Sequence, residues 1–219
     1  MKTLFFTQEF FVCAVNEKGK VPFLKQTEVW TGLVVGGILE LVSGGYIQTD
    51  EKEKYVPVKP LEAEKHYLQP LYDVVAQKPM KATKIAEKYI CSTKLFMQLF
   101  NAIGESLSEA ECAEKAVNQS FFGEKVAFIP KSDCADTIIE KIRTELLKND
   151  TVSDDTIILC ALLDKAGLIK NYFSKVESDK LKVRLKEIRS SDAHKTIRKV
   201  LDSLDASYAA LAAVMIINS

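Results

Sequence analysis

The residue types that most often carry out catalysis are sparse in this chain. Its 219 residues include two histidines, His66 and His194, and both lie in polar, helix-like surroundings. Neither histidine lies near a cysteine, a G-x-S-x-G turn or a carboxylate arranged as in a nucleophilic site. We therefore interpret both imidazoles as solvent-exposed and expect that the protein is not an enzyme.

The sequence also lacks the patterns typical of metal and cofactor sites. Neither phosphate-binding glycine motif occurs, G-x-x-x-x-G-K-[ST] or G-x-G-x-x-G. The five cysteines are widely spaced without a C-x-x-C pair, which favours buried thiols in a reducing compartment. The adjacent Asp154 and Asp155 are interpreted as partners of a helix dipole at a helix start. We expect no cofactor and no bound metal.

Glu40 lies within the most apolar stretch of the chain. A carboxylate in such surroundings must be paired with a cation or tipped toward an exposed end of its helix. We interpret Glu40 as one partner of a structural ion pair and not as a catalytic acid.

One segment, residues 175–199, concentrates positive charge. Two interpretations of it are open: a solvated helix face, which we favour because acidic residues dilute the lysines and arginines, or a surface that faces phosphate groups. In the second interpretation the candidate anion-binding residues are Lys182 and Arg184.

The composition describes an ordinary globular protein. Hydrophobic residues make up 47% and charged residues 27%, and 30 Lys and Arg balance 30 Asp and Glu. Zero net charge argues against bulk attraction to nucleic acid or anionic lipid, so such binding needs a local patch. No apolar run approaches the ~20 residues needed to cross a bilayer. We expect one cytoplasmic domain over residues 1–219 without a transmembrane segment, and the oligomeric state stays open.

The clearest predicted element is a helix over residues 29–43. Its apolar residues cover nearly the whole circumference, which is typical of a helix in the centre of a core. Gly36 and Gly37 indicate close approach of a neighbouring helix. Gly44 and Gly45 then end the helix.

Most of the remaining chain also has helical periodicity. A short β-hairpin is predicted around the charged turn 50–54, and a second one over residues 121–129. Helices are predicted over residues 61–76, 82–89, 93–105, 108–117, 134–147, 156–166, 181–188, 196–204 and 207–217. The fold class is therefore mainly α, a compact multi-helix bundle around a central buried helix, with short β-hairpins.

The order of the helices 82–89 and 93–105 and the later hairpin is that of a winged helix. In a DNA-binding protein the second helix would enter the major groove. That helix offers Lys94, Gln98 and Asn101 but no arginine, and the chain has no net positive charge. The alternative function that this order suggests is a winged-helix-like regulator that binds DNA or a protein partner.

Two sequence segments resemble the Golgi phosphoprotein 3 family. They are TQEFFVCAVNEKG at residues 7–19 and GLVVGGILELVSGGYI at residues 32–47, and DTIILCALLDKAGLI at residues 155–169 is similar to a third family segment. The resemblance implies a mainly helical domain and a non-enzymatic role at a membrane surface or as an adaptor. Eukaryotic members of the family bind phosphatidylinositol 4-phosphate and the cytoplasmic tails of glycosyltransferases.

The resemblance also locates the family's lipid pocket on this sequence. The family uses a tryptophan, whose place falls near Leu24 or Lys25, and arginines, whose places fall at Val34 and near residues 105–111. Those phosphate-binding groups are missing here. The chain resembles a short prokaryotic-type member of the family. If an anionic lipid headgroup binds, we expect Lys25 and Trp30 to contact it.

The adjacent aromatics Phe121 and Phe122 give a further candidate contact. In a hairpin they would either insert into an interface with a membrane or protein partner or belong to the core. We therefore expect a membrane-peripheral or adaptor protein, with nucleic acid the less favoured partner.

Overall fold

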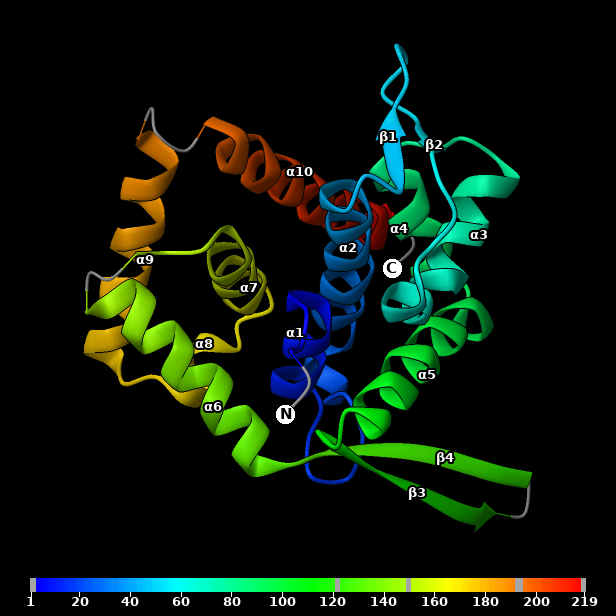
Figure 1. Cartoon of the computed structure of the whole chain (residues 1–219), viewed down its shortest axis with the longest axis horizontal. Helices are drawn as coiled ribbons and strands as arrows, with labels where there is room; N and C mark the ends of the chain where they lie inside the picture. The colour runs from blue at the N-terminus through cyan, green and yellow to red at the C-terminus, as the bar shows by residue number, and fades with distance from the viewer. Residues whose placement is uncertain (1–2, 121–122, 149–150, 192–194, 218–219) are drawn as a thin grey trace.

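The computed structural model describes residues 3–120, 123–148, 151–191 and 195–217. Within these residues the chain is mainly helical, with two antiparallel two-stranded sheets, so the predicted fold class is confirmed. Figure 1 shows α1 and α2 between a group of helices formed by α6 to α9 and a second group formed by α3 to α5. The last helix, α10, runs from one group to the other and contacts α9, α7, α2 and α4.

The elements have the following bounds. The helices are α1 (Phe6–Ala14), α2 (Gln26–Ser43), α3 (Gln69–Gln77), α4 (Ala82–Ile90), α5 (Thr93–Glu109), α6 (Ser132–Ile142), α7 (Asp154–Lys165), α8 (Ile169–Tyr172), α9 (Lys175–Ser190) and α10 (Lys195–Ile217). Shorter helical turns are η1 (Phe23–Lys25), η2 (Ala63–Leu68) and the π-helical η3 (Arg143–Leu147). The strands are β1 (Ile47–Thr49), β2 (Tyr55–Pro57), β3 (Ala113–Ser120) and β4 (Gly123–Pro130).

Helix α2 is the central element of the core, as predicted. Every residue from Val29 to Leu41 is buried, and α2 contacts α1, α3, α4, α7 and α10. The close approach expected at the glycines is present: a Cβ added at Gly37 would lie 2.7 Å from Leu71 Cδ2, and one at Gly36 would lie 3.3 Å from Leu162 Cδ1. Gly45 has φ +68° directly after the helix, and Tyr46 N–H donates to Leu41 O at 2.9 Å. That left-handed residue and its hydrogen bond end the helix.

Glu40 forms the buried ion pair that its position predicted. Lys65 Nζ lies 2.6 Å from Glu40 Oε1, the Tyr67 hydroxyl donates to the same oxygen, and Thr7 N–H donates to Oε2 at 3.2 Å. Both charged side chains are almost completely buried. Burial lowers the pKa of Lys65 and raises that of Tyr67. The pair ties α2 to η2 and to the first turn of α1.

The first predicted hairpin is present, but the second is misplaced: the predicted span 121–129 lies mostly in the single strand β4, whose partner β3 precedes it. One predicted helix is also wrong. Ile47 pairs with Pro57 in the first hairpin, and Ala113 pairs with Pro130 in the second, so the second hairpin is longer than expected. The helix predicted over residues 108–117 does not form. Helix α5 ends at Glu109, Glu111 takes φ +61°, and the following residues pair with β4 as β3.

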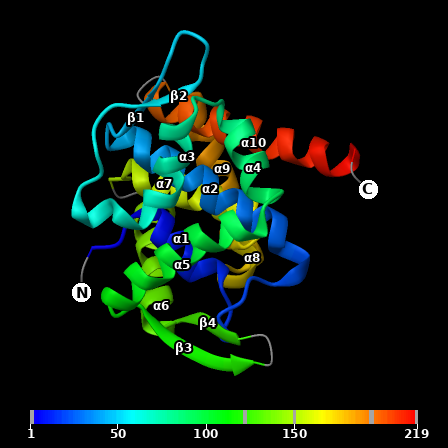
Figure 2. The ribbon, with the colours of Figure 1, turned by 90° about the vertical axis from the view of Figure 1, so that its right-hand side faces the viewer.

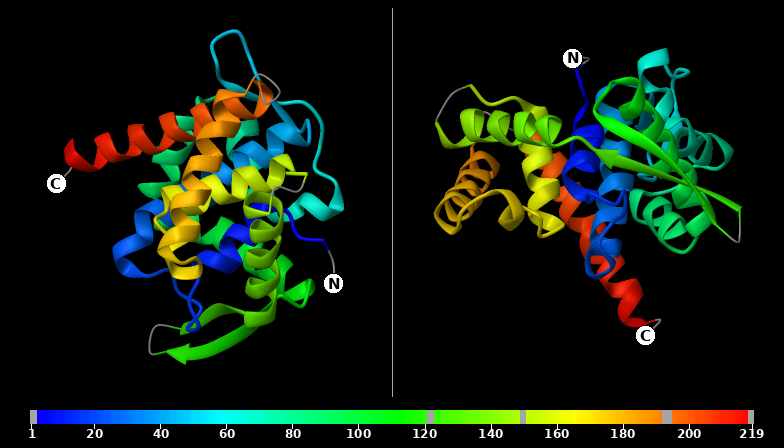
Figure 3. Two further views of the ribbon diagram at one scale, coloured as in Figure 1. Left: turned by 90° about the vertical axis from the view of Figure 1, so that its left-hand side faces the viewer. Right: turned by 90° about the horizontal axis from the view of Figure 1, so that it is seen from below.

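Figures 2 and 3 show how the ends of the molecule are placed. The segment 15–25, which precedes α2, lies close to the β3–β4 hairpin, while β1 and β2 lie beyond the other end of α2. The C-terminal end of α10 stands clear of the other helices in both side views. Among the described residues, none of the helices combines the length and the apolar composition that crossing a bilayer requires.

Candidate functional site

The most exposed large apolar side chains in the described part of the chain are neighbours. Phe23 is 85% exposed and Leu24 is 87% exposed. They lie in the short turn η1, where Pro22 begins the turn and no neighbouring element covers the two side chains. Two adjacent exposed apolar side chains mark an interaction surface more often than isolated ones do.

The sequence just before this turn determines how the two side chains are presented. Asn16 Oδ1 accepts hydrogen bonds from the N–H groups of Lys18 and Lys20, and Gly19 takes φ +67°. A Cβ added at Gly19 would lie 2.9 Å from Ala127 Cβ, so the turn rests directly against β4. The loop of residues 16–25, which we call the Phe23–Leu24 loop, therefore packs against β4 near Gly19 and is exposed at Phe23 and Leu24.

Lys25 is the last residue of η1 and Trp30 lies in the second turn of α2, in different surroundings. The Lys25 side chain is partly buried, and a Cβ added at Gly167 would lie 2.6 Å from its Nζ. Its ammonium group therefore lies at the C-terminal end of α7, where the helix dipole favours a cation. The Trp30 ring is stacked on Phe96 with 3.9 Å between ring centroids and is 9% exposed, so it belongs to the core.

Lys182 and Arg184 lie on α9, in two different cavities. Lys182 Nζ is 4.0 Å from Asp164 Oδ1, in the last turn of α7, and Arg184 Nη1 is 3.3 Å from Glu187 Oε2. Lys25 and Lys182 thus approach the same end of α7, whereas Trp30 and Arg184 lie elsewhere. The four residues do not form one pocket, and anion binding by them stays a prediction. Phe121 and Phe122 lie outside the described residues, between β3 and β4.

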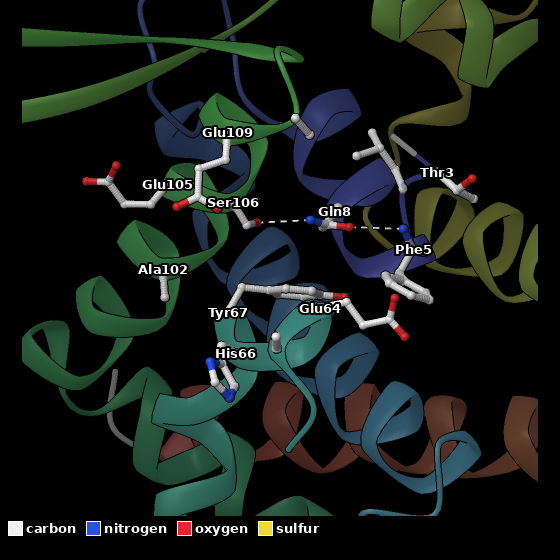
Figure 4. Close-up of a pocket in the computed structure, with 13 residues that line it drawn as sticks. Thr3, Phe5, Gln8, Glu64, His66, Tyr67, Ala102, Glu105, Ser106 and Glu109 are labelled. Carbon is white, nitrogen blue, oxygen red and sulfur yellow. Dashed lines mark hydrogen bonds between the residues drawn. The ribbon is translucent and has the colours of Figure 1, made fainter. Parts of the chain in front are cut away.

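A separate cavity of about 460 Å³ opens between the start of α1, η2 and the C-terminal half of α5 (Figure 4). The Gln8 side chain lines this cavity and joins α1 to α5. Phe5 N–H donates to Gln8 Oε1 at 3.0 Å, and Gln8 Nε2 donates to Ser106 Oγ at 2.9 Å. The Ser106 hydroxyl donates to Ile103 O, and the His66 ring lies 3.3 Å from Leu61 O. Because serine and imidazole have separate partners, the cavity does not present a nucleophile activated by a base.

The described residues bring no three His, Cys, Asp or Glu side chains together in a way that could hold a metal ion. Cys13, Cys112, Cys134 and Cys160 are buried, and Cys91 is exposed. Burial raises the pKa of the Cys112 thiol to about 12, which keeps that sulfur protonated and unreactive.

Comparison with known families decides the relationship that the two N-terminal segments suggested. The sequence matches the family profile described as Golgi phosphoprotein 3 (GPP34) over residues 7–204. The chain belongs to the Golgi phosphoprotein 3 family. No curated protein matches the sequence. The match extends from α1 into α10 and so includes the buried Glu40 on α2 and the whole β3–β4 hairpin.

Sequence reasoning missed the two most exposed large apolar side chains in the described part of this family member. Phe23 and Leu24 do not belong to a segment with helical or strand periodicity. Their spacing therefore does not assign them to a buried face or to a surface. The available signal was their position: two large apolar residues follow a proline, between Lys20 and Lys25, in a segment with turn composition. Such residues have no helix or strand that would bury them.

Proposed function

We propose that this member of the Golgi phosphoprotein 3 family is a non-enzymatic, membrane-peripheral adaptor that attaches to bilayers through the Phe23–Leu24 loop. The exposure of Phe23 and Leu24 is the observation that carries the proposal. In this proposal the chain works as a single domain over residues 1–219 on the cytoplasmic side of a membrane.

The chemistry of the loop suits the boundary between lipid headgroups and acyl chains. Phe23 and Leu24 would leave water on insertion, which contributes about 1.5–3 kcal/mol for each side chain. Lys18 and Lys20 are exposed in the same loop, together with one carboxylate, Glu17. Each lysine near an anionic surface adds about 1 kcal/mol, so the expected attachment is reversible and needs anionic lipid.

Vesicle co-sedimentation tests the proposal. Neutral, anionic and phosphoinositide-containing vesicles are compared with wild-type protein, the double variant Phe23→Ser/Leu24→Ser, and Lys25→Ala. We expect wild-type protein to sediment with anionic vesicles, and the double variant to lose at least about tenfold in affinity, because about 1.4 kcal/mol already corresponds to that factor.

The matched control is Val176→Ser/Val183→Ser. These two side chains are also exposed, at 64% and 55%, but they lie on α9 and do not belong to the Phe23–Leu24 loop. The control should bind vesicles as wild type does. If the protein sediments with no vesicle, or if both double variants bind equally, the loop is not a membrane anchor.

A further inference from the structure

The lysines of this neutral protein are not evenly spread. A groove with a volume of about 560 Å³ is lined by five of them, Lys54, Lys78, Lys81, Lys84 and Lys88. Glu87 is the only acidic residue in the described lining, so the lining carries a net charge of about +4. Met80, Pro79 and Cys91 contribute the apolar part of the surface. We call this surface the lysine groove.

Local structure fixes the two sides of the lysine groove. On one side, Tyr55 N–H at the start of β2 donates to Met80 O at 2.9 Å, which holds Lys54 next to the segment 78–81. On the other side, α4 turns Ile85, Ala86 and Tyr89 into the core. Lys81, just before the helix, and Lys84 and Lys88 on it therefore follow at spacings of three and four residues on a face beside the buried one, in one row along the groove.

Two of the five lysines are already paired. Lys81 Nζ lies 2.7 Å from Glu53 Oε2, and Lys84 Nζ lies 2.6 Å from Glu87 Oε2. Lys54, Lys78 and Lys88 form no ion pair with any residue that the structure describes. Like charges gathered in this way repel one another, and an anionic partner would relieve that repulsion.

The row of charges fits an extended chain better than a single compact anion. Along α4 the rise between Lys81 and Lys84 is about 4.5 Å, and between Lys84 and Lys88 about 6 Å. In an extended peptide, alternate side chains on one face are about 6.6 Å apart. One phosphate group would reach one or two of these ammonium groups, whereas acidic residues on alternate positions would reach the whole row.

The apolar part of the groove also favours a peptide. Met80 is partly buried between the two lysine-bearing sides and offers an adaptable thioether surface. A nucleic acid strand would place further phosphates beyond the groove, where the chain as a whole has no excess of positive charge.

From these observations we infer that the lysine groove binds an acidic, extended peptide segment of a protein partner, with carboxylates on alternate residues. The site is separate from the Phe23–Leu24 loop and does not depend on membrane attachment.

A binding experiment without vesicles tests this inference. The probe is a fluorescein-labelled peptide of alternating glutamate and leucine, and the comparison peptide has glutamine in place of glutamate. Wild-type protein should bind the acidic peptide, more weakly as salt is added, and should not bind the glutamine peptide. The triple variant Lys54→Gln/Lys78→Gln/Lys88→Gln should bind the acidic peptide at least about tenfold more weakly.

The matched control is Lys170→Gln/Lys175→Gln/Lys199→Gln. It removes the same amount of charge from exposed lysines that form no ion pair within the described residues and lie outside the groove. This control should bind as wild type does. Equal losses in the two triple variants, or an undiminished affinity of the groove variant, would overturn the inference.

The exposed Cys91 reports where the peptide binds. Because the other four cysteines are buried, a maleimide should modify Cys91 first, and bound acidic peptide should slow that reaction. No protection of Cys91 by saturating peptide would contradict the location. The contrary result is a single-stranded oligonucleotide that binds more tightly than the peptide and fails to bind the groove variant. That result would contradict the peptide and identify nucleic acid as the ligand of the groove.

Discussion

Gly32 on α2 faces a side chain from α1 and a side chain from α10. A Cβ added at this residue would lie 2.5 Å from Phe10 Cζ and 2.8 Å from the Tyr208 hydroxyl oxygen. Phe10 is fully buried, and the Tyr208 hydroxyl donates to Glu28 O at 3.0 Å, so neither group can move without breaking other contacts.

We therefore predict that Gly32→Ala lowers the free energy of unfolding by about 1–3 kcal/mol. The gain in helix propensity, up to about 1 kcal/mol, is smaller than this cost. Urea denaturation measures the difference. Gly36→Ala is the control on the same helix, because a Cβ there would meet its nearest neighbour at 3.3 Å. Equal effects of the two substitutions would show that close packing at Gly32 does not limit stability.

Glu40 shows what sequence reasoning can and cannot predict about one residue. Its position in an apolar helix requires a partner, since an unpaired buried charge is too costly. The partner, Lys65, is 25 residues away on a 3₁₀ turn, and nothing in the spacing identifies it. Local chemistry therefore predicts that a buried charge is paired, while the choice of partner depends on how the helices pack.

The same limit appears among the secondary-structure elements. Helix α7 was predictable because Ser153 caps its first turn and Gly167, with φ +65°, ends it. The helix expected over residues 108–117 failed because the chain turns at Glu111, where neither glycine nor proline marks the turn. The strand that follows is stabilised by pairing with β4, which no local propensity reports.

Helix α9 begins with a cap that includes a charged carboxylate, so the stability contributed by this cap depends on pH. At its start the Ser174 hydroxyl accepts from Glu177 N–H, while the Glu177 carboxylate accepts from Ser174 N–H at 2.8 Å and from Arg143 Nε at 2.9 Å. These two hydrogen bonds lower the pKa of Glu177 to about 2. The cap joins α9 to η3.

We predict that Glu177→Gln is less stable than wild type at neutral pH and that the difference shrinks as the solution is acidified. A lowered carboxyl pKa adds stability above the unfolded value of 4.5, and that stability is lost as the pH falls toward about 2. Thermal unfolding between about pH 7 and pH 3 measures the trend. Ser174→Ala, which removes the hydroxyl of the cap and keeps the carboxylate, should cost about 1 kcal/mol at neutral pH. A constant deficit for Glu177→Gln would contradict the assigned pKa.

Across the whole molecule, the two proposed binding surfaces are formed by different segments around α2. The Phe23–Leu24 loop precedes the helix, and the β1–β2 hairpin, which borders the lysine groove, follows it (Figure 1). The 18 residues of α2 span about 27 Å, and α2 is buried along most of that length. The surface proposed for lipid and the surface proposed for an acidic peptide therefore belong to different segments, as the proposed adaptor role requires.

This separation predicts that the protein can hold a vesicle and a peptide at the same time. The labelled acidic peptide should sediment with anionic vesicles only when protein is present, and its affinity should change by less than about twofold on membrane attachment, because neither ligand displaces the other. Phe23→Ser/Leu24→Ser should leave the peptide bound to protein in the supernatant, and the Lys54, Lys78 and Lys88 triple variant should sediment without peptide. If vesicles instead compete with the peptide, the lysine groove itself binds the membrane, and the two ligands do not have separate surfaces.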